Sequence, residues 1–108
     1  MKNGKYIEYG VERWYRDGKR HREDGPAVTY PNGTECWYRD NKYHRVEGPA
    51  IIYPGGTECW YKDGKLHRED GPAITYHDGA EFYYINGEEV DPLYIDLLKV
   101  KESCNEER

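Results

Sequence analysis

The chain has no long apolar run, no basic run and almost no serine. No stretch approaches the roughly 18 apolar residues of a membrane span or looks like a signal peptide, so we expect a cytoplasmic protein without a membrane partner. The net charge of −5, without a run of Lys and Arg, argues against DNA or RNA as a partner. Because Ser103 is the only serine, a Ser–His pair has nowhere to form. We therefore predict that the protein is not an enzyme.

The three cysteines are not expected to pair. Cys36 and Cys59 are equivalent positions of a repeat (59 − 36 = 23), and Cys104 lies near the C-terminal end. Equivalent residues of stacked hairpins lie about 9–10 Å apart, whereas a disulfide needs Cα atoms within about 7 Å. Phe82 follows at the same interval, so we predict that this position serves packing rather than redox chemistry.

What the chain does contain is one phrase in three copies, which start at Trp14, Trp37 and Trp60. The copies read WYRDGKRHREDGPA, WYRDNKYHRVEGPA and WYKDGKLHREDGPA, at a constant offset (37 − 14 = 23; 60 − 37 = 23). A short fixed period indicates one small unit stacked on itself. Only 36% of the residues are hydrophobic, so we expect the twelve Tyr and three Trp to supply much of the packing.

Each unit is predicted to be a β-hairpin. Residues 49–53 and 57–61 are rich in β-branched and aromatic side chains, and the turns 54–56 and 63–64 follow them. Two series of turn residues recur at the repeat period, where a positive φ is required. These are Gly10, Gly33, Gly56 and Gly79, and Gly18, Asn41, Gly64 and Gly87.

The predicted fold is therefore all-β, a meander of β-hairpin repeats in an elongated, twisted sheet with a C-terminal capping α-helix. Residues 1–108 are expected to form a single domain. The segments are a degenerate opening strand (1–13), three repeats (14–82), a closing strand (83–91), and a capping helix and tail (92–108). Within the sheet, side-chain alternation places Val28, Ile51 and Ile74 on one face. The main contact between repeats is predicted to be the column Trp14, Trp37, Trp60 and Tyr83.

The helix is predicted from Asp91-Pro92, which supplies an N-cap and a proline at the first helical position. Leu93, Leu97 and Val100 then fall on one helical face. We expect the helix to extend to about Ser103 and to cover the exposed edge of the sheet with this face.

At the residues Tyr-x-Asp-Gly-Lys and Gly-x-Ala-x-x-Tyr-x-Asn-Gly, over about residues 5–87, the chain resembles MORN-type repeats. It is most similar to a variant with the phrase His-Arg-Glu-Asp-Gly-Pro-Ala, seen in small proteins of bacteria, bacteriophages and large viruses. The resemblance implies a non-catalytic scaffold that presents a surface. It further implies an antitoxin-like or phage anti-defence inhibitor, acting in the host cytoplasm by occlusion of a host defence or toxin protein. The segment His21–Asp24 lengthens the usual pattern, so the phospholipid binding of some family members is not transferred.

A histidine and an arginine stand side by side in every copy, as His21, Arg22, His44, Arg45, His67 and Arg68. Ligands about 9–10 Å apart along a stack cannot converge on one zinc ion, so no metal site and no cofactor are expected. One alternative is a polar clamp, in which each His bonds the backbone and each Arg pairs with Asp24, Glu47 or Asp70. The other is an anion-binding ladder that holds a nucleotide.

The copies differ where stacking does not fix the residue. After the lysine that follows each turn they have Arg20, Tyr43 and Leu66, and three residues later the middle copy has Val46 in place of Glu. These four residues are candidates for an exposed partner-binding patch. The alternative is that Val46 and neighbouring Ile52 pack under the twisted sheet.

Three functions stay open at this point. The first is binding and occlusion of another protein, and the second is a sponge that sequesters a nucleotide signal through the Arg/His ladder. The third is a structural oligomerising module, for which the open sheet edge at Lys5–Tyr9 would support a homodimer.

Overall fold

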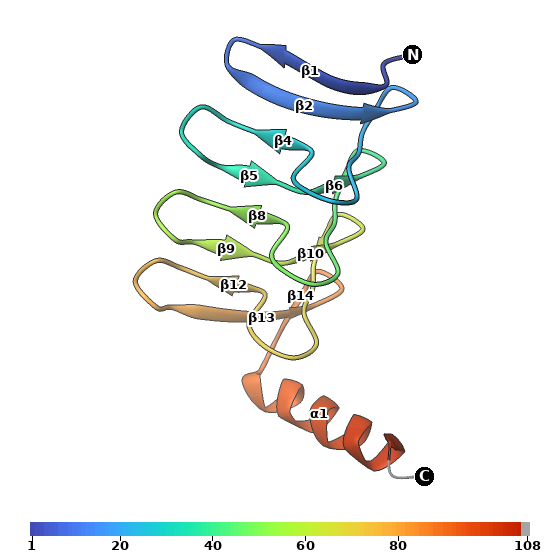
Figure 1. Cartoon of the computed structure of the whole chain (residues 1–108). Helices are drawn as coiled ribbons and strands as arrows, with labels where there is room; N and C mark the ends of the chain where they lie inside the picture. Colours follow the sequence, from blue (N-terminus) through green and yellow to red (C-terminus); the bar gives the residue numbers. More distant parts are fainter. Residues whose placement is uncertain (107–108) are drawn as a thin grey trace.

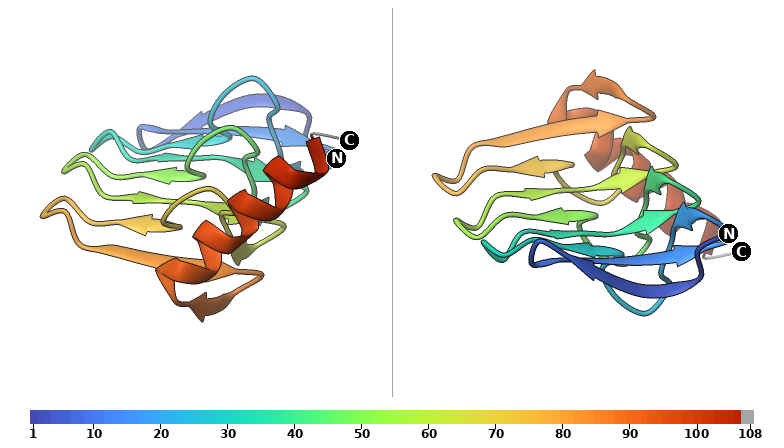
Figure 2. Two further views of the ribbon diagram at one scale, coloured as in Figure 1. Left: turned by 90° about the horizontal axis from the view of Figure 1, so that it is seen from below. Right: turned by 90° about the horizontal axis from the view of Figure 1, so that it is seen from above.

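The computed structural model describes residues 1–106, whose regular secondary structure is mostly β-strand. The strands of the main sheet form an antiparallel meander, and the N-terminal hairpin and the C-terminal helix lie at opposite ends of the stack (Figure 1). The principal extents are 47 × 35 × 21 Å, and the sheet twists along its length (Figure 2). The predicted fold class, an elongated sheet of hairpin repeats with a C-terminal helix, is confirmed.

Most strands contain only two residues. They are β1 (Gly4–Glu8), β2 (Val11–Arg16), β3 (Lys19–Arg20), β4 (Val28–Thr29), β5 (Glu35–Cys36), β6 (Tyr38–Arg39), β7 (Lys42–Tyr43), β8 (Ile51–Ile52), β9 (Glu58–Cys59), β10 (Tyr61–Lys62), β11 (Lys65–Leu66), β12 (Ile74–Thr75), β13 (Glu81–Ile85) and β14 (Glu88–Val90), followed by α1 (Pro92–Glu106).

The hairpins form two columns. The main sheet has the strand order β1-β2-β4-β5-β8-β9-β12-β13-β14 and contains the hairpins β4–β5, β8–β9 and β12–β13. The short hairpins β6–β7 and β10–β11 lie beside it (Figure 1). The predicted strand 57–61 is interrupted at Trp60, whose backbone N–H donates to the carbonyl oxygen of Ala73 at 2.6 Å. Each repeat therefore contains two hairpins rather than the single one predicted, because the chain leaves the main sheet at the tryptophan.

The predicted turns are confirmed in detail. All eight turn positions have a positive φ, from 69° at Asn41 to 103° at Gly56. In the short hairpins the residue before the turn glycine is also positive, as at Asp63 (50°) and Gly64 (83°), which is the pattern of a type I′ turn. Asn41 tolerates this backbone, and its Oδ1 also accepts a hydrogen bond of 2.8 Å from the backbone N–H of Arg20.

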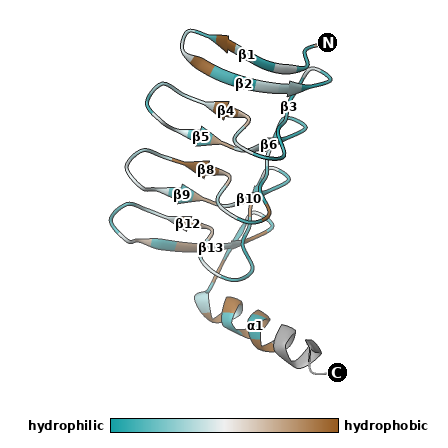
Figure 3. Cartoon of the chain, viewed as in Figure 1, coloured by the Kyte–Doolittle hydropathy of each residue, from teal (hydrophilic) through white to brown (hydrophobic). Residues whose placement is uncertain are grey.

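The core is a single row of side chains across the main sheet. Neighbouring strands pair Val28, Cys36, Ile51, Cys59, Ile74 and Phe82 in that order. The row is fully buried at Val28 and 38% exposed at Phe82, so packing thins toward the C-terminal end. The common face predicted for the three aliphatic members is confirmed. Cys36 and Cys59 are free thiols, while the side chain of Cys104 lies outside the described part of the chain. In Figure 3 strands β4 and β8 are brown, whereas β5 and β9, which each begin with a glutamate, carry teal.

Both ends of the sheet are hairpins rather than the single strands predicted. Residues 1–13 supply β1 and the start of β2, which reverse at Tyr9-Gly10. Residues 83–91 continue β13 and add β14 after a turn at Asn86-Gly87. Two successive residues with positive φ make each reversal sharp enough for an extra strand.

Helix α1 begins as predicted and ends three residues later than predicted. The Asp91 carboxylate accepts a hydrogen bond of 2.8 Å from the backbone N–H of Leu93, which confirms the N-cap. The helix continues past Ser103 to Glu106, and residues 107–108 lie outside the described part of the chain. No helix within residues 1–106 is both long and apolar enough to cross a bilayer.

The predicted packing face of the helix is wrong. Leu93, Leu97 and Val100 are 62%, 59% and 60% exposed, whereas Ile95 is only 1% exposed. Periodicity indicates which residues share a helical face, but it does not decide which face docks. The helix runs obliquely across the end of the stack, and Ile95 is its buried anchor (Figure 2).

Two adjacent glycines test the turn assignment. Gly55 and Gly56 both have open space where a Cβ would be added, but only Gly56 has a positive φ. We predict that Gly56→Ala lowers the free energy of unfolding by about 1–2 kcal/mol, because an L side chain is strained there. Gly55→Ala should be neutral or stabilise the protein by about 0.4–1 kcal/mol. Urea denaturation of the two variants measures the difference, and equal effects would refute the assignment.

Candidate functional site

A histidine links every repeat to the next one. The ring Nδ1 accepts a hydrogen bond from a backbone N–H of the following unit, at 3.2 Å for His21 and Asp40, 3.0 Å for His44 and Asp63, and 3.0 Å for His67 and Asn86. Because a backbone amide can only donate, Nδ1 has no proton, and a neutral ring carries its proton on Nε2. The histidine part of the predicted polar clamp is confirmed.

The arginine beside each histidine lies between an indole ring and a glycine. In the first repeat the Arg22 guanidinium lies over Trp14, and a Cβ added to Gly25 would come within 2.8 Å of its Cζ. Its Nη1 donates to the carbonyl oxygen of Pro26 at 3.3 Å. The distances from guanidinium to ring centroid are 4.2 Å for Arg22 over Trp14, 3.8 Å for Arg45 over Trp37, and 3.9 Å for Arg68 over Trp60. The repeated Gly-Pro dipeptide therefore leaves space for the arginine and supplies it with an acceptor.

The carboxylate part of the clamp is present in two copies only. Arg22 Nε donates to Asp24 at 3.0 Å, and Arg68 Nε donates to Asp70 at 2.9 Å. The predicted pairing of Arg45 with Glu47 is wrong, since no ion pair joins them among the described side chains. An aspartate two residues after the arginine is short enough to bond its guanidinium. The longer side chain of Glu47 does not bring its carboxylate within 4 Å of the Arg45 guanidinium.

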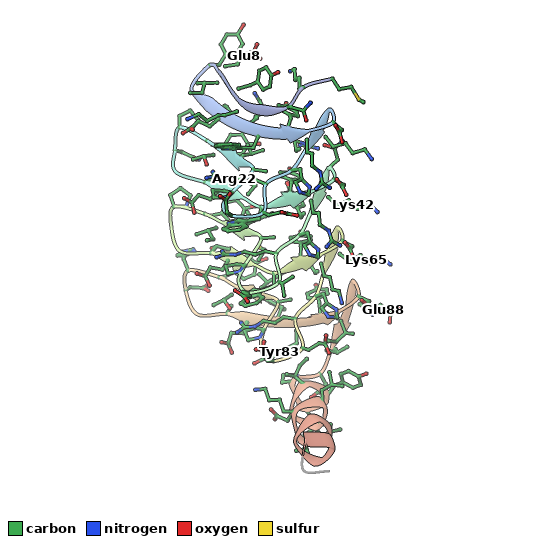
Figure 4. The ribbon with its side chains drawn as sticks, turned by 45° about the vertical axis from the view of Figure 1, so that its right-hand side comes forward. Glu8, Arg22, Lys42, Lys65, Tyr83 and Glu88 are labelled. Atoms are coloured by element: carbon green, nitrogen blue, oxygen red, sulfur yellow. The ribbon has the colours of Figure 1, made fainter. Side chains whose placement is uncertain are left out.

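Successive histidine–arginine loops enclose two clefts. The first cleft, of about 370 Å³, is lined by Trp37, His44 and Arg45 together with the carboxylates of Glu23, Asp24 and Glu47. The second cleft, of about 600 Å³, is lined by Trp60 and by residues of the loops that carry Arg45 and Arg68. Residues 44–48 are here called the middle loop, and Arg45, Val46 and Glu47 of this loop border both clefts. Figure 4 shows Arg22 on the face that carries these loops, away from the edge where Lys42, Lys65 and Glu88 lie one below another.

The middle loop leaves its histidine without an acceptor. His21 Nε2 lies 3.6 Å from Glu23 Oε1, and His67 Nε2 lies 3.1 Å from Glu69 Oε2. Only the second of these contacts is a hydrogen bond, and His21 Nε2 and His44 Nε2 both lack a partner in the part of the chain that the structure describes. The middle copy has Val46 in place of the glutamate, so His44 Nε2 also lacks a facing carboxylate. His44 is 9% exposed, whereas Val46 is 78% exposed. The differences among the three repeat copies single out Val46, but they do not predict that His44 Nε2 lacks a facing carboxylate.

The other three candidate partner-binding residues lie elsewhere. Arg20 lies over the Tyr38 ring at 4.3 Å and donates to its hydroxyl at 3.2 Å. Tyr43 stacks on Tyr38 at 4.6 Å and contacts Tyr61 of the next repeat at 5.0 Å. Leu66 is half-buried opposite Tyr61. These residues fill the contact between short hairpins, so the structure does not bring them into one exposed patch with Val46.

Tyrosines, rather than the predicted tryptophan column, make the closest ring contact between repeats. The Tyr43–Tyr61 pair joins the second repeat to the third, whereas every Trp of the phrase is covered by the arginine of its own repeat. The reason is the length of the loop, which brings an arginine back over each indole before the next repeat begins.

Charges around His44 favour its neutral form. Burial lowers the pKa of His44, and the positive charge of Arg39 lowers it further, although Asp63 opposes both. Arg39 is itself bonded to Asp63 at 2.7 Å, and this hydrogen bond holds the pKa of Asp63 below its usual range. Within the described residues, no three His, Cys, Asp or Glu side chains are placed to hold a metal ion. The first cleft thus combines hydrogen-bond donors, the carboxylates that line it and the apolar side chain of Val46.

Comparison of the chain with protein-family models, curated proteins and solved structures found no match.

A double-mutant cycle tests the arginine–glycine contact. Gly25→Ala should lower the free energy of unfolding by about 1–3 kcal/mol, because the new methyl group forces the Arg22 guanidinium off the Trp14 ring. In the background of Arg22→Ala the same change should cost much less, since the clash is gone. Equal costs in both backgrounds, measured by urea denaturation, would contradict the proposed packing.

Acid should weaken the protein through His44. Because burial lowers its pKa in the folded state, the unfolded chain binds the proton more readily, with the usual pKa near 6.5. The stability is fully present above that pH and is lost as the pH falls through the lower, folded pKa. His44→Asn keeps an acceptor for the Asp63 N–H but does not titrate. We therefore predict a smaller fall in Tm between about pH 7.5 and pH 5 for His44→Asn than for the wild type. An unchanged fall would contradict this assignment.

Proposed function

We propose that the protein is a non-catalytic binding protein that occludes a surface of another protein, with the loop-bearing face as its interface. The observation that carries the proposal is the middle loop, which places the 78% exposed Val46 between two clefts. An exposed apolar side chain flanked by concave, polar surface is typical of an anchor in a protein interface.

The fold itself supports binding rather than chemistry. Stacked hairpins give a rigid, extended face at little cost in ordering on association. The resemblance to MORN-type repeats points the same way, toward a scaffold that presents a surface. In the bacterial or phage setting that this resemblance implies, the partner is a host defence or toxin protein.

Capture of a nucleotide by the whole Arg/His ladder is less well supported. Arg22 and Arg68 already bond an aspartate, a proline carbonyl and an indole ring, so binding an anion there would replace existing contacts. Of the three ladder arginines, only Arg45 has no carboxylate partner among the described side chains. A single such arginine suits one carboxylate contact better than a row of phosphates.

Two exposed apolar residues allow a matched test. Val46 lies on the middle loop, and Ile7, 62% exposed, lies on β1 at the far edge of the sheet. The tagged protein is used to capture its partner from an extract of cells in which it acts. Val46→Arg should weaken capture at least about tenfold, whereas Ile7→Arg should not, and both variants should keep the wild-type Tm. Equal capture by both variants would refute the loop face as the interface. A Tm increase with a nucleotide, and no captured protein, would favour the sponge.

A further inference from the structure

The first and third repeats show what the second repeat lacks. In both of them a Glu of the loop faces histidine Nε2, and the following Asp bonds the arginine. In the middle loop Val46 removes the first carboxylate, and Glu47 does not replace the second. The third copy is thus filled, because Glu69 is hydrogen-bonded to His67 Nε2 and Asp70 to Arg68. In the first copy Asp24 bonds the arginine, but Glu23 faces His21 Nε2 without a hydrogen bond. The second copy, here called the open copy, has neither carboxylate contact.

The open copy presents donors of fixed direction. The Asp63 N–H holds the His44 ring through Nδ1, so a neutral ring directs an N–H at Nε2 toward the position that Glu occupies in the other copies. Trp37 also lines the first cleft, and its buried Nε1–H has no acceptor among the described residues. Arg45 adds a positive charge that makes no ion pair within 4 Å among the described side chains, although Glu23, Asp24 and Glu47 line the same cleft.

We infer that the first cleft binds an acidic side chain of the partner protein, whose carboxylate accepts a hydrogen bond from His44 Nε2 beside the Arg45 guanidinium. The inference rests on the proposed function and adds the chemistry of recognition. The carboxylate takes the place that Glu23 and Glu69 take in the sister loops. Val46 contacts an apolar residue next to the acidic one, because its side chain lies at the mouth of the same cleft.

A buried donor without an acceptor makes this contact selective. A charge-assisted hydrogen bond from a desolvated N–H is stronger than one between neutral groups. An uncharged side chain of similar shape leaves His44 and Arg45 less well satisfied, so the site discriminates Glu or Asp from Gln or Asn. The same donors would bind a phosphate less well, because the single positive charge of Arg45 does not balance the two negative charges of a phosphate dianion.

The sister loops supply the decisive variant. Val46→Glu should place a carboxylate on His44 within the chain, raise Tm by about 2–5 °C and close the site. Val46→Met introduces a side chain about as long as that of glutamate but without a carboxylate, so this variant should leave the site open. The probe is the peptide acetyl-Leu-Glu-Asp-Leu-amide, with acetyl-Leu-Gln-Asn-Leu-amide as its neutral match at equal ionic strength.

Nuclear magnetic resonance of the His44 ring nitrogens and the Trp37 indole N–H reports binding directly. The acidic peptide should shift these signals in the wild type and in Val46→Met, and the shift should be lost in Val46→Glu. The double variant Glu69→Val, Asp70→Glu gives the third loop the residues of the middle loop and should create a second responding site at His67. Equal shifts with the neutral peptide, shifts with inorganic phosphate but not the acidic peptide, or an unchanged response in Val46→Glu would each overturn the inference.

Partner capture separates this inference from the proposed function. If Val46→Arg abolishes capture and Val46→Glu does not, the loop face is the interface but the carboxylate site is wrong. If the acidic peptide binds as expected and no variant changes capture, the carboxylate site stands and the proposed function is wrong.

Discussion

The hydrogen bond from a backbone N–H to a histidine Nδ1 is the constraint around which each repeat is arranged. It joins the turn of one short hairpin to the loop of the repeat before it, at 3.0–3.2 Å in all three copies. The acceptor must be unprotonated, so the same bond fixes which ring nitrogen carries hydrogen. One contact therefore connects neighbouring repeats and also determines the chemistry of the side chain that lines the cleft.

The arginine sandwich explains why so much of the phrase is repeated without change. The indole supports one side of the guanidinium, the glycine allows its approach on the other, and the proline carbonyl fixes its end. The tryptophan, the glycine and the proline carbonyl all contact the same guanidinium, so the role of each in the packing depends on the others. A residue such as Arg22 that looks exposed and available in the sequence is in fact held inside its own loop, which is why an identical phrase is weak evidence of a ligand site.

The repeat, its turns and its helix N-cap could be predicted because they depend on local backbone requirements. The positive φ at Gly56 or Asn41 is required by the turn alone, and the sequence shows a Gly or Asn at these positions in every repeat. Contacts that depend on how the long loop returns to the sheet could not be predicted. The burial of Ile95 in place of Leu93, and the packing of Tyr43 between repeats, follow from tertiary placement. The sequence marks Val46 as different, but it does not predict that His44 Nε2 lacks a facing carboxylate, because the position of a loop glutamate relative to the ring depends on the fold.

The position of the open copy in the stack has a consequence for its order. In a linear array each unit contacts only its neighbours, so local unfolding starts from the ends and reaches the centre last. The open loop belongs to the second of three repeats and has a complete unit on either side of it. Fraying of β1 or of the helix therefore leaves its geometry intact, and the binding groups remain pre-organised while the ends of the molecule exchange with solvent.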